Sequence, residues 1–318
     1  GGGGAVPARA AGPGATAGET LRLVVNPRAA ALGGALAAFS DGVLALEGNP
    51  AGLGWLQQTE GVAMHAEWLA GVQMESLAAV GPIRGGGAGW FLNYLHLEDL
   101  SRRGAQGGDL GRFGFSDLVV RVGWGGRLAE RLAVGGAVTS FSELIDNISG
   151  SAGAVDLGVQ ARPTGLLTLG AAVQHLGTSL TMDQRGVALP LTVRTGLAFR
   201  LKTRVTRREA FALSLEGSAS KGADTDLRAG LELWPVGAMA LRAGYRTRFF
   251  EGALGGLTGF SGGIGLRPGA HWLFDYAFAP FGLRNGFGLT HRASLGYRFG
   301  SETPARLART FRDRLDHP

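Results

Sequence analysis

The side chains that most often carry catalysis occur in this chain, but their spacing forms no familiar catalytic arrangement. Six histidines are scattered along the sequence: His65, His96, His175, His271, His291 and His317. A zinc hydrolase typically carries H-E-x-x-H, and that string does not occur. The G-x-S-x-G string of serine hydrolases occurs at 259–263, but there it begins a predicted strand and does not form the strand-to-helix elbow that exposes the serine. Cysteine is absent, which excludes disulfides and thiolate metal sites. We therefore expect a protein that is not an enzyme, with no catalytic residues and no metal.

The glycine-rich strings and the positive charge point to no cofactor and no nucleic acid. Gly123, Gly125 and Gly126 lie at the end of a predicted strand with no helix after them. A phosphate-binding loop needs that helix, because its first amides hold the phosphate. The net charge of +6 is distributed over alternating positions and connectors rather than along one stripe with aromatic residues. We expect neither a nucleotide cofactor nor nucleic-acid binding.

Charged side chains recur instead at every second position of short segments. In one such segment Leu241, Ala243 and Tyr245 alternate with Arg242 and Arg246. A strand places alternate residues on opposite faces, so one face is apolar and the other is charged. In a membrane barrel the apolar face meets lipid and the charged face lines the lumen. The predicted lumen-facing polar residues are Asp156, Arg194, Glu216, Arg228, Glu232, Arg242, Arg246, Asp275 and Arg292.

Fourteen segments of this kind fill residues 59–300, and they predict an all-β fold, a transmembrane antiparallel β-barrel. They start near residues 60, 72, 87, 115, 131, 151, 166, 190, 209, 225, 238, 258, 270 and 290. Each is about ten residues long, enough for a tilted strand to cross the hydrocarbon. Tight, proline-containing connectors such as Gly81-Pro82 and Trp234-Pro235 follow even-numbered segments. Longer ones, including 98–114 and 177–189, follow odd-numbered segments. Short periplasmic turns are typical of outer-membrane barrels, so we expect the bacterial outer membrane with both termini periplasmic.

The chain before the barrel predicts a flexible leader over residues 1–20 and a plug over residues 21–58. Asn26 and Pro27 are typical of a helix start, and we expect that helix to continue through Ala29 to Phe39. Gly33 and Gly34 weaken a helix, so close packing against the barrel wall should compensate. Asn49, Pro50 and Gly52 predict a second, single-turn element, although an ordinary turn remains an alternative.

Two further regions suggest contacts with partners. The outer connectors of the last strands carry apolar residues at Phe249, Phe250, Leu254, Phe281, Leu283 and Phe287. Such side chains would bind a protein partner or fold inward over the lumen. In the tail, residues 301–318, Leu307, Phe311 and Leu315 predict an amphipathic periplasmic helix that docks on anionic lipid or a protein. A solvated tail is the alternative.

Several strings together resemble the PorV/PorQ-like outer-membrane proteins, which are in turn similar to FadL-type barrels. They are Ala31–Ala35, Asn49–Leu53, Val155–Val159, Val173–Gly177, Leu241–Tyr245 and Phe274–Phe278. His175 stands where that family often has asparagine. The resemblance covers roughly residues 26–299 and implies a fourteen-stranded barrel whose N-terminal segment plugs the lumen.

The resemblance also implies two possible functions. PorV-type members of the type IX secretion system hold or shuttle secreted proteins, and FadL-type barrels admit hydrophobic molecules through the outer membrane. Our first expectation is a docking component for a secreted or envelope protein. The alternative is a FadL-like transporter of hydrophobic small molecules, with a wall opening at the poorly alternating segment Ala88 to Leu97. A purely structural barrel is a third possibility.

Overall fold

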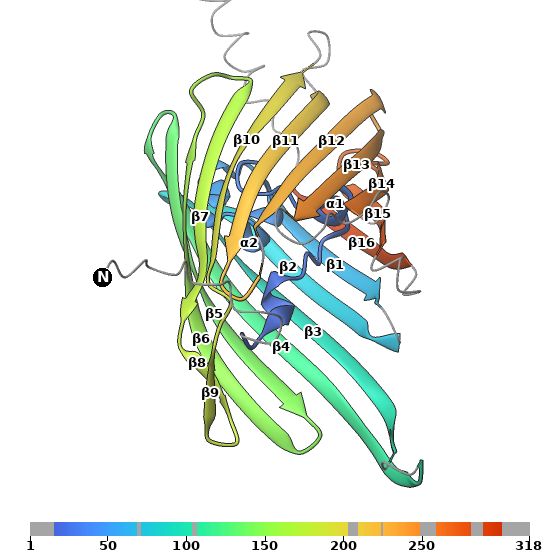
Figure 1. Ribbon diagram of the computed structural model, residues 1–318. Coiled ribbons are helices and arrows are strands. Elements are labelled where there is room, and N and C mark those ends of the chain that lie inside the picture. Colours follow the sequence, from blue (N-terminus) through green and yellow to red (C-terminus); the bar gives the residue numbers. More distant parts are fainter. Residues whose placement is uncertain are drawn as a thin grey trace, which may run out of the picture.

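The computed structural model describes residues 16–68, 71–103, 107–202, 209–223, 225–248, 259–280 and 289–300. Fourteen antiparallel strands close into a barrel in the order β1-β16-β15-β14-β13-β12-β11-β10-β7-β6-β5-β4-β3-β2. The remaining two strands, β8 and β9, form a separate hairpin (Figure 1). The predicted fold of about fourteen strands is confirmed. Within the described residues, no helix has the length and apolar character needed to cross a membrane.

The strands of the barrel differ widely in length. Their bounds are β1 Thr59–Glu67, β2 Gln73–Ile83, β3 Gly86–Arg103, β4 Asp109–Ala129, β5 Leu132–Ile145, β6 Ile148–Ala161, β7 Leu167–Gly177, β10 Thr192–Lys202, β11 Glu209–Ser220, β12 Asp226–Val236, β13 Met239–Arg248, β14 Phe260–Leu266, β15 Trp272–Pro280 and β16 Leu289–Phe299. β8 spans Ser179–Met182 and β9 spans Arg185–Ala188.

The alternation predicted from the sequence is present in the structure. Leu241 and Tyr245 are 41% and 39% exposed on the outer surface, whereas Arg242 between them is 6% exposed. Trp272, Phe274 and Tyr276 are likewise exposed along β15. Exposed apolar side chains therefore cover the outside of the barrel, and the charged side chains of the same strands are buried within it.

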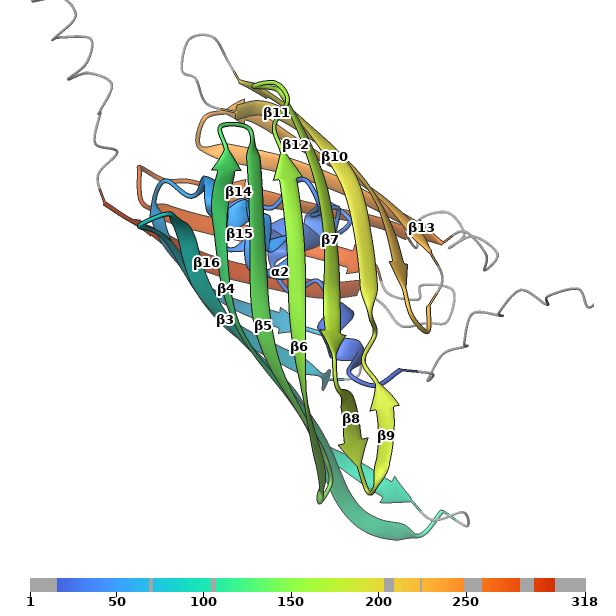
Figure 2. The same ribbon diagram turned by 90° about the vertical axis from the view of Figure 1, so that its left-hand side faces the viewer.

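The two ends of the barrel are unlike each other. At one end, here called the short-turn end, short turns join β2 to β3, β4 to β5 and β12 to β13. At the other, the hairpin end, β3–β4 and β5–β6 project beyond the neighbouring strands together with β8–β9, at the bottom of Figure 2. β3 and β4 contain 18 and 21 residues, about twice the predicted length.

The structure corrects four sequence-based expectations. Most of the predicted connector 98–114 belongs to β3 and β4, and the predicted connector 177–189 contains β8 and β9. Pro82 and Pro235 lie inside β2 and β12 instead of in turns. The predicted wall opening at β3 is also absent, because residues 86–96 pair without interruption with β2 and residues 87–97 with β4.

The segment before β1 lies inside the barrel as short helical turns and loops, drawn in blue in Figure 1. It contains η1 Glu19–Arg22, α1 Pro27–Ala31, α2 Leu44–Glu47 and η2 Pro50–Trp55. The expectation of a helix through Phe39 is wrong, because α1 ends at Ala31. Gly33 and Gly34 both adopt positive φ, which stops the helix and turns the chain along the wall.

Candidate functional site: the plug and the lumen

The plug, predicted over residues 21–58, is here extended to the described residues 16–58, and it runs through the lumen from one end of the barrel to the other. Leu21 packs with Val119 and Leu180 near the hairpin end. Trp55 lies at the opposite end, where the Arg162 guanidinium stacks 4.1 Å from its ring. Most of the plug residues between these points are buried. The plug therefore fills the cross-section of the barrel.

Two asparagines organise the plug as the sequence predicts. Asn26 accepts a hydrogen bond from the Arg28 amide at 2.9 Å and thereby caps α1 ahead of Pro27. Asn49 accepts from the Ala51 amide at 3.1 Å and caps η2, which begins at Pro50. The Asn49 side-chain amide also donates to Ala37 O at 2.8 Å and to Val159 O of β6 at 3.0 Å. One side chain thus joins two parts of the plug to the wall.

Glycines of the wall admit the plug backbone at several strands. A Cβ added at Gly125 of β4 would lie 2.5 Å from Pro50 O, and one at Gly230 of β12 would lie 2.7 Å from Leu32 O. At Gly158 of β6 it would overlap the Asn49 side chain, and at Gly170 of β7 it would overlap Ala37 O. Larger residues at these positions would push the plug away from the wall.

One group of ion pairs ties α1 to the wall strands β12, β13 and β15. Arg28 donates from Nε to Glu232 Oε2 at 2.8 Å and from Nη2 to Oε1 at 2.9 Å. Arg242 donates to the same Glu232 at 2.6 Å and to Asp275 at 2.6 Å. Arg28 also contacts Asp41 of the plug at 3.2 Å. Glu232 is completely buried, so its charge depends on these partners.

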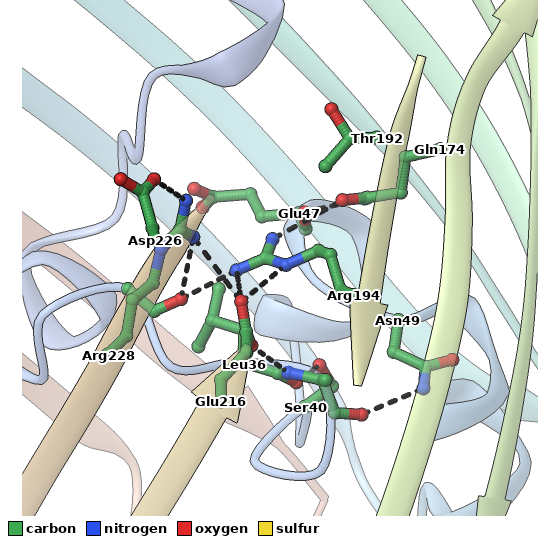
Figure 3. Close-up of polar contacts among 12 residues, drawn as sticks. Leu36, Ser40, Glu47, Asn49, Gln174, Thr192, Arg194, Glu216, Asp226 and Arg228 are labelled. Carbon is green, nitrogen blue, oxygen red and sulfur yellow. Dashed lines mark hydrogen bonds and ion pairs between the residues drawn. The ribbon is translucent and has the colours of Figure 1, made fainter. Parts of the chain in front are cut away.

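A second group holds the plug loop that follows α1, as Figure 3 shows. Glu216 accepts from Arg194 Nε at 2.7 Å and from the Ala37 amide at 2.6 Å. Arg194 and Arg228 both donate to the carbonyl oxygen of Gly34, at 2.6 Å and 3.2 Å. Arg228 pairs further with Asp226, which also binds Arg246. Charged groups from three wall strands therefore surround one stretch of plug backbone.

A third polar group lies on β4, β6 and β7. Asp156 Oδ1 accepts a hydrogen bond from the His175 amide at 2.7 Å. Arg121 Nε lies 3.5 Å from the other carboxylate oxygen, Oδ2. His175 has a φ of 59°, at a register shift between β6 and β7. Arg121 also donates to Leu46 O of the plug. The strained backbone at His175 is thus stabilised by the Asp156 carboxylate.

The structure brings together most of the residues that the sequence pattern singled out. Asp156, Arg194, Glu216, Arg228, Glu232, Arg242 and Arg292 are all buried inside the barrel, and Asp275 and Arg246 are partly buried there. Arg292 is separate from the ion-pair groups and stacks 4.4 Å over Trp68. The predicted partner-binding residues Phe249, Phe250, Leu254, Phe281, Leu283 and Phe287 lie outside the described residues, as does the tail 301–318.

Several charged residues of this site were missed by the sequence analysis, among them Arg121, Arg28 and Asp41. Arg121 has the inward parity of β4 and was identifiable by the same rule as Arg242. Arg28 and Asp41 belong to the plug, whose irregular backbone has no period that would orient them. Of the histidines, His175 is buried in the lumen, while His65 and His96 lie towards the outside, within 3.2 Å and 3.1 Å of Glu75.

The inner wall of β1, β2 and β3 has a different character from the charged strands opposite. Its buried apolar residues, here called the apolar strip, are Val62, Met64, Ala66, Met74, Ala78, Val80, Phe91 and Leu95. One polar pair interrupts the strip, Ser76 and Asn93, which bond each other at 2.6 Å. Val25, Val43, Leu46 and Leu53 of the plug pack against it. The lumen is therefore charged on one side and apolar on the other.

Burial and charge shift the protonation of two plug carboxylates in opposite directions. Burial raises the pKa of Glu47, although its carboxylate accepts the Val25 and Asn26 amides at 3.0 Å and 3.2 Å. For Asp41, burial acts in the same direction, but the Arg28 and Arg200 guanidinium groups outweigh it and hold the pKa well below its usual range. Glu47 is thus the plug carboxylate whose charged form the closed lumen disfavours.

Little free space remains between plug and wall. Two cavities there, one lined by Glu47, His175 and Arg194 and the other by Asp41, Glu60 and Arg267, each have a volume of about 30 Å³. Such a volume holds about two water molecules. A larger groove of about 410 Å³ lies at the hairpin end, lined by Tyr94, Phe113 and Leu144 among others. At these two cavities the plug and the wall are therefore closely packed.

Comparison with known proteins relates this architecture to solved barrels. No protein-family model matches the sequence, and the search of curated proteins finds no match. Among solved structures, the Ralstonia pickettii toluene transporter TbuX superposes with a TM-score of 0.57 at 15% identity, covering 86% of this chain and 97% of that one. The monoaromatic hydrocarbon channel CymD gives 0.60 at 12% identity, covering 87% and 97%. A Pseudomonas aeruginosa FadL homologue gives 0.55 at 10% identity, covering 86% and 98%. At these identities the likeness establishes a shared FadL-like barrel fold.

Proposed function

We propose that this chain is a non-enzymatic channel that admits hydrophobic small molecules through the bacterial outer membrane. The apolar strip supports the proposal most directly. A barrel that carried polar solutes would gain nothing from an apolar wall along one side of its lumen, whereas an apolar molecule needs such a surface to leave water. The fold shared with transporters and channels named for toluene and monoaromatic hydrocarbons agrees with it.

The contrast between the two sides of the lumen suggests how passage occurs. Moving the plug away from Glu232 and Glu216 would leave buried charges without partners, which costs about 3–5 kcal/mol for a broken pair. Moving it away from the apolar strip loses apolar contacts that an entering hydrophobic molecule replaces. We therefore propose that hydrophobic molecules pass between the plug and β1–β3, with residues 16–58 acting as the plug.

The placement in the membrane follows from the outer surface. Exposed apolar residues such as Val122, Leu197, Leu241 and Leu295 suit a lipid environment around the barrel. We assign the short-turn end to the periplasm, as in other outer-membrane barrels. β16 ends there at Phe299, whereas Thr16, beside Gly222, lies near the hairpin end. The expected periplasmic location of both termini stays a prediction, because residues 1–15 and 301–318 lie outside the described part.

Docking of a secreted or envelope protein, our first expectation from the sequence, has less support. The similar solved structures are channels and transporters, and the PorV branch finds no counterpart among those reported. The loop and tail residues on which docking would depend lie outside the described residues. We keep transport as the proposed function.

An uptake assay in vesicles with a lipopolysaccharide outer leaflet tests the proposal. Radiolabelled toluene is the probe, and the test variant is Met74→Gln, which places an amide in the apolar strip at a fully buried position. Burying an unpaired amide costs about 1–3 kcal/mol, so uptake should fall about tenfold. Met182→Gln on β8 is the matched control, since Met182 packs outside the strip. Uptake no faster than in vesicles without the protein would refute the proposal.

A further inference from the structure

A small cavity at the short-turn end lies between the plug, the wall strands β1, β15 and β16, and the turn that follows β14. Its volume is about 30 Å³, and Gly42 and Val43 of the plug form part of its lining. Its charged lining residues are Arg28, Asp41, Glu60, Arg267, Asp275 and Arg298. Three cations and three carboxylates thus border the cavity itself.

The carboxylates in and around this cavity are already engaged by other arginines. Asp41 contacts Arg28 at 3.2 Å, and Glu60 binds Arg298 at 2.9 Å. Asp275 binds Arg242 at 2.6 Å. The neighbouring Glu232 accepts two hydrogen bonds from Arg28, one from Arg242 and one from Trp234 Nε1 at 3.2 Å. A carboxylate accepts about four hydrogen bonds, so Glu232 has no capacity left.

Arg267 is the cation without a carboxylate of its own. It begins the turn between β14 and β15, and its amide donates to Ala238 O at 2.8 Å, which fixes the turn. Its guanidinium stacks 4.1 Å from the Trp234 ring. Among the described residues, no carboxylate oxygen lies within 4.0 Å of this guanidinium. The stack fixes its orientation and leaves its N–H donors available at the cavity.

The electrostatic environment of Arg267 favours a negative ion. Burial and the nearby Arg28 and Arg298 guanidinium groups lower the pKa of Arg267 to about 10. The side chain therefore remains charged at neutral pH, where Arg28 and Arg298 repel it and the more weakly acting Glu232 and Asp275 attract it. An anion bound there would relieve this repulsion and would accept charge-assisted hydrogen bonds from the guanidinium.

We propose that Arg267 and the cavity beside Asp41 bind a small anion, of halide or carboxylate size, at the boundary between plug and wall. The ion's size is limited by the cavity, which leaves no room for a sugar acid or a nucleotide. Because plug and wall both border the cavity, the bound anion adds an interaction across their boundary. It therefore stabilises the closed barrel. This site adjoins the apolar strip at Val62, but the anion proposal does not depend on the transport proposal.

Anion titration of the purified full-length barrel tests the site. The protein is exchanged into sodium gluconate, an anion too large for the cavity, and its melting temperature is followed as sodium formate is added at constant ionic strength. The wild-type protein should show a saturable rise in melting temperature. Arg267→Gln should shift the midpoint at least about tenfold towards higher formate, and Arg267→Lys should restore part of the response. Arg131→Gln, an exposed arginine at the same end, serves as the control and should behave as wild type.

A crystal grown with sodium bromide supplies a second measurement that does not depend on stability. An anomalous peak within hydrogen-bonding distance of the Arg267 guanidinium is the expected result. Identical formate responses in wild type and Arg267→Gln, or a bromide-free cavity in the wild-type crystal, would overturn the proposal. If Arg267→Gln does not fold, the wild-type bromide peak and the Arg267→Lys titration decide the question.

Discussion

Arg28 of the plug and Glu232 of β12, 204 residues apart in the chain, meet inside the barrel through two parallel hydrogen bonds of 2.8 Å and 2.9 Å. Two guanidinium nitrogens, Nε and Nη2, and both carboxylate oxygens take part. This bidentate geometry is the strongest available to such a pair. Neither side chain has appreciable contact with solvent. This pair therefore holds the beginning of the plug to the charged side of the lumen.

Replacing Arg28 with methionine should loosen the plug. The substitution leaves Glu232 buried with Arg242 as its remaining guanidinium partner, and breaking a buried pair in this way costs about 3–5 kcal/mol. We expect a lower melting temperature and a higher conductance in planar bilayers. Arg22→Met is the matched control, because Arg22 forms an ion pair with the largely exposed Glu19. The double variant Arg28→Met/Glu232→Leu removes both charges and should recover part of the stability. Unchanged conductance in Arg28→Met would contradict this role.

Two glycines of β6 offer a matched test of the fit between plug and wall. A Cβ at Gly158 would overlap the Asn49 side chain, whereas a Cβ at Gly153 would meet no atom within 4 Å. Gly158→Ala should therefore lower the free energy of unfolding by about 1–3 kcal/mol, the usual cost of overpacking. Gly153→Ala should have almost no effect. Denaturant titration in detergent measures both, and equal stability of the two variants would show that the plug does not depend on this contact.

The buried Glu47 predicts a specific pH dependence. Its pKa is raised from 4.5 in the folded protein. Below about pH 4.5 the group is protonated in both folded and unfolded chains, and its burial carries no charge penalty. As the pH rises through the raised pKa, stability is lost. Glu47→Gln keeps an acceptor for the Val25 and Asn26 amides and removes this titration. The variant should melt at a higher temperature than wild type at pH 8 and at the same temperature at pH 4. If Glu47→Gln were less stable than wild type at pH 8, the charged Glu47 carboxylate would stabilise the fold, and its pKa would not be raised.

The barrel fold could be predicted from the sequence because the alternation of apolar and charged residues is a local property. Arg242 between Leu241 and Ala243 is enough to assign inner and outer faces, and strand number follows from repetition. Strand ends were harder: residues 98–103 and 109–114 carry no clear alternation, yet they pair with each other beyond the lipid-facing part of the wall. There the pairing partner, rather than the local pattern, determines the structure.

The plug was predictable in its caps and not in its path. Asn26 and Asn49 act on amides two residues away, so local sequence reveals them. The end of α1 at Ala31 depends on Gly33 fitting against Tyr245 and Ala229 of the wall, which no local pattern shows. No local pattern shows the partners of Arg28 or of the Gly34 carbonyl oxygen either, because they lie on distant wall strands. The charged residues of the wall were identified from alternation, but what they bind became visible only in three dimensions.

Locking the plug to the wall tests whether hydrophobic molecules pass only when the plug moves. A Cβ at Gly54 of η2 would lie 3.2 Å from Ala133 Cβ of β5, close to the roughly 3.5–4.5 Å that a disulfide spans. The chain has no cysteine, so Gly54→Cys/Ala133→Cys introduces one defined pair, with each single variant as a control. Toluene uptake into vesicles is then measured before and after reduction. Vesicles with the oxidised double variant should take up no more toluene than protein-free vesicles, and reduction should restore uptake. Equal uptake in the oxidised and reduced states would contradict passage through movement of the plug.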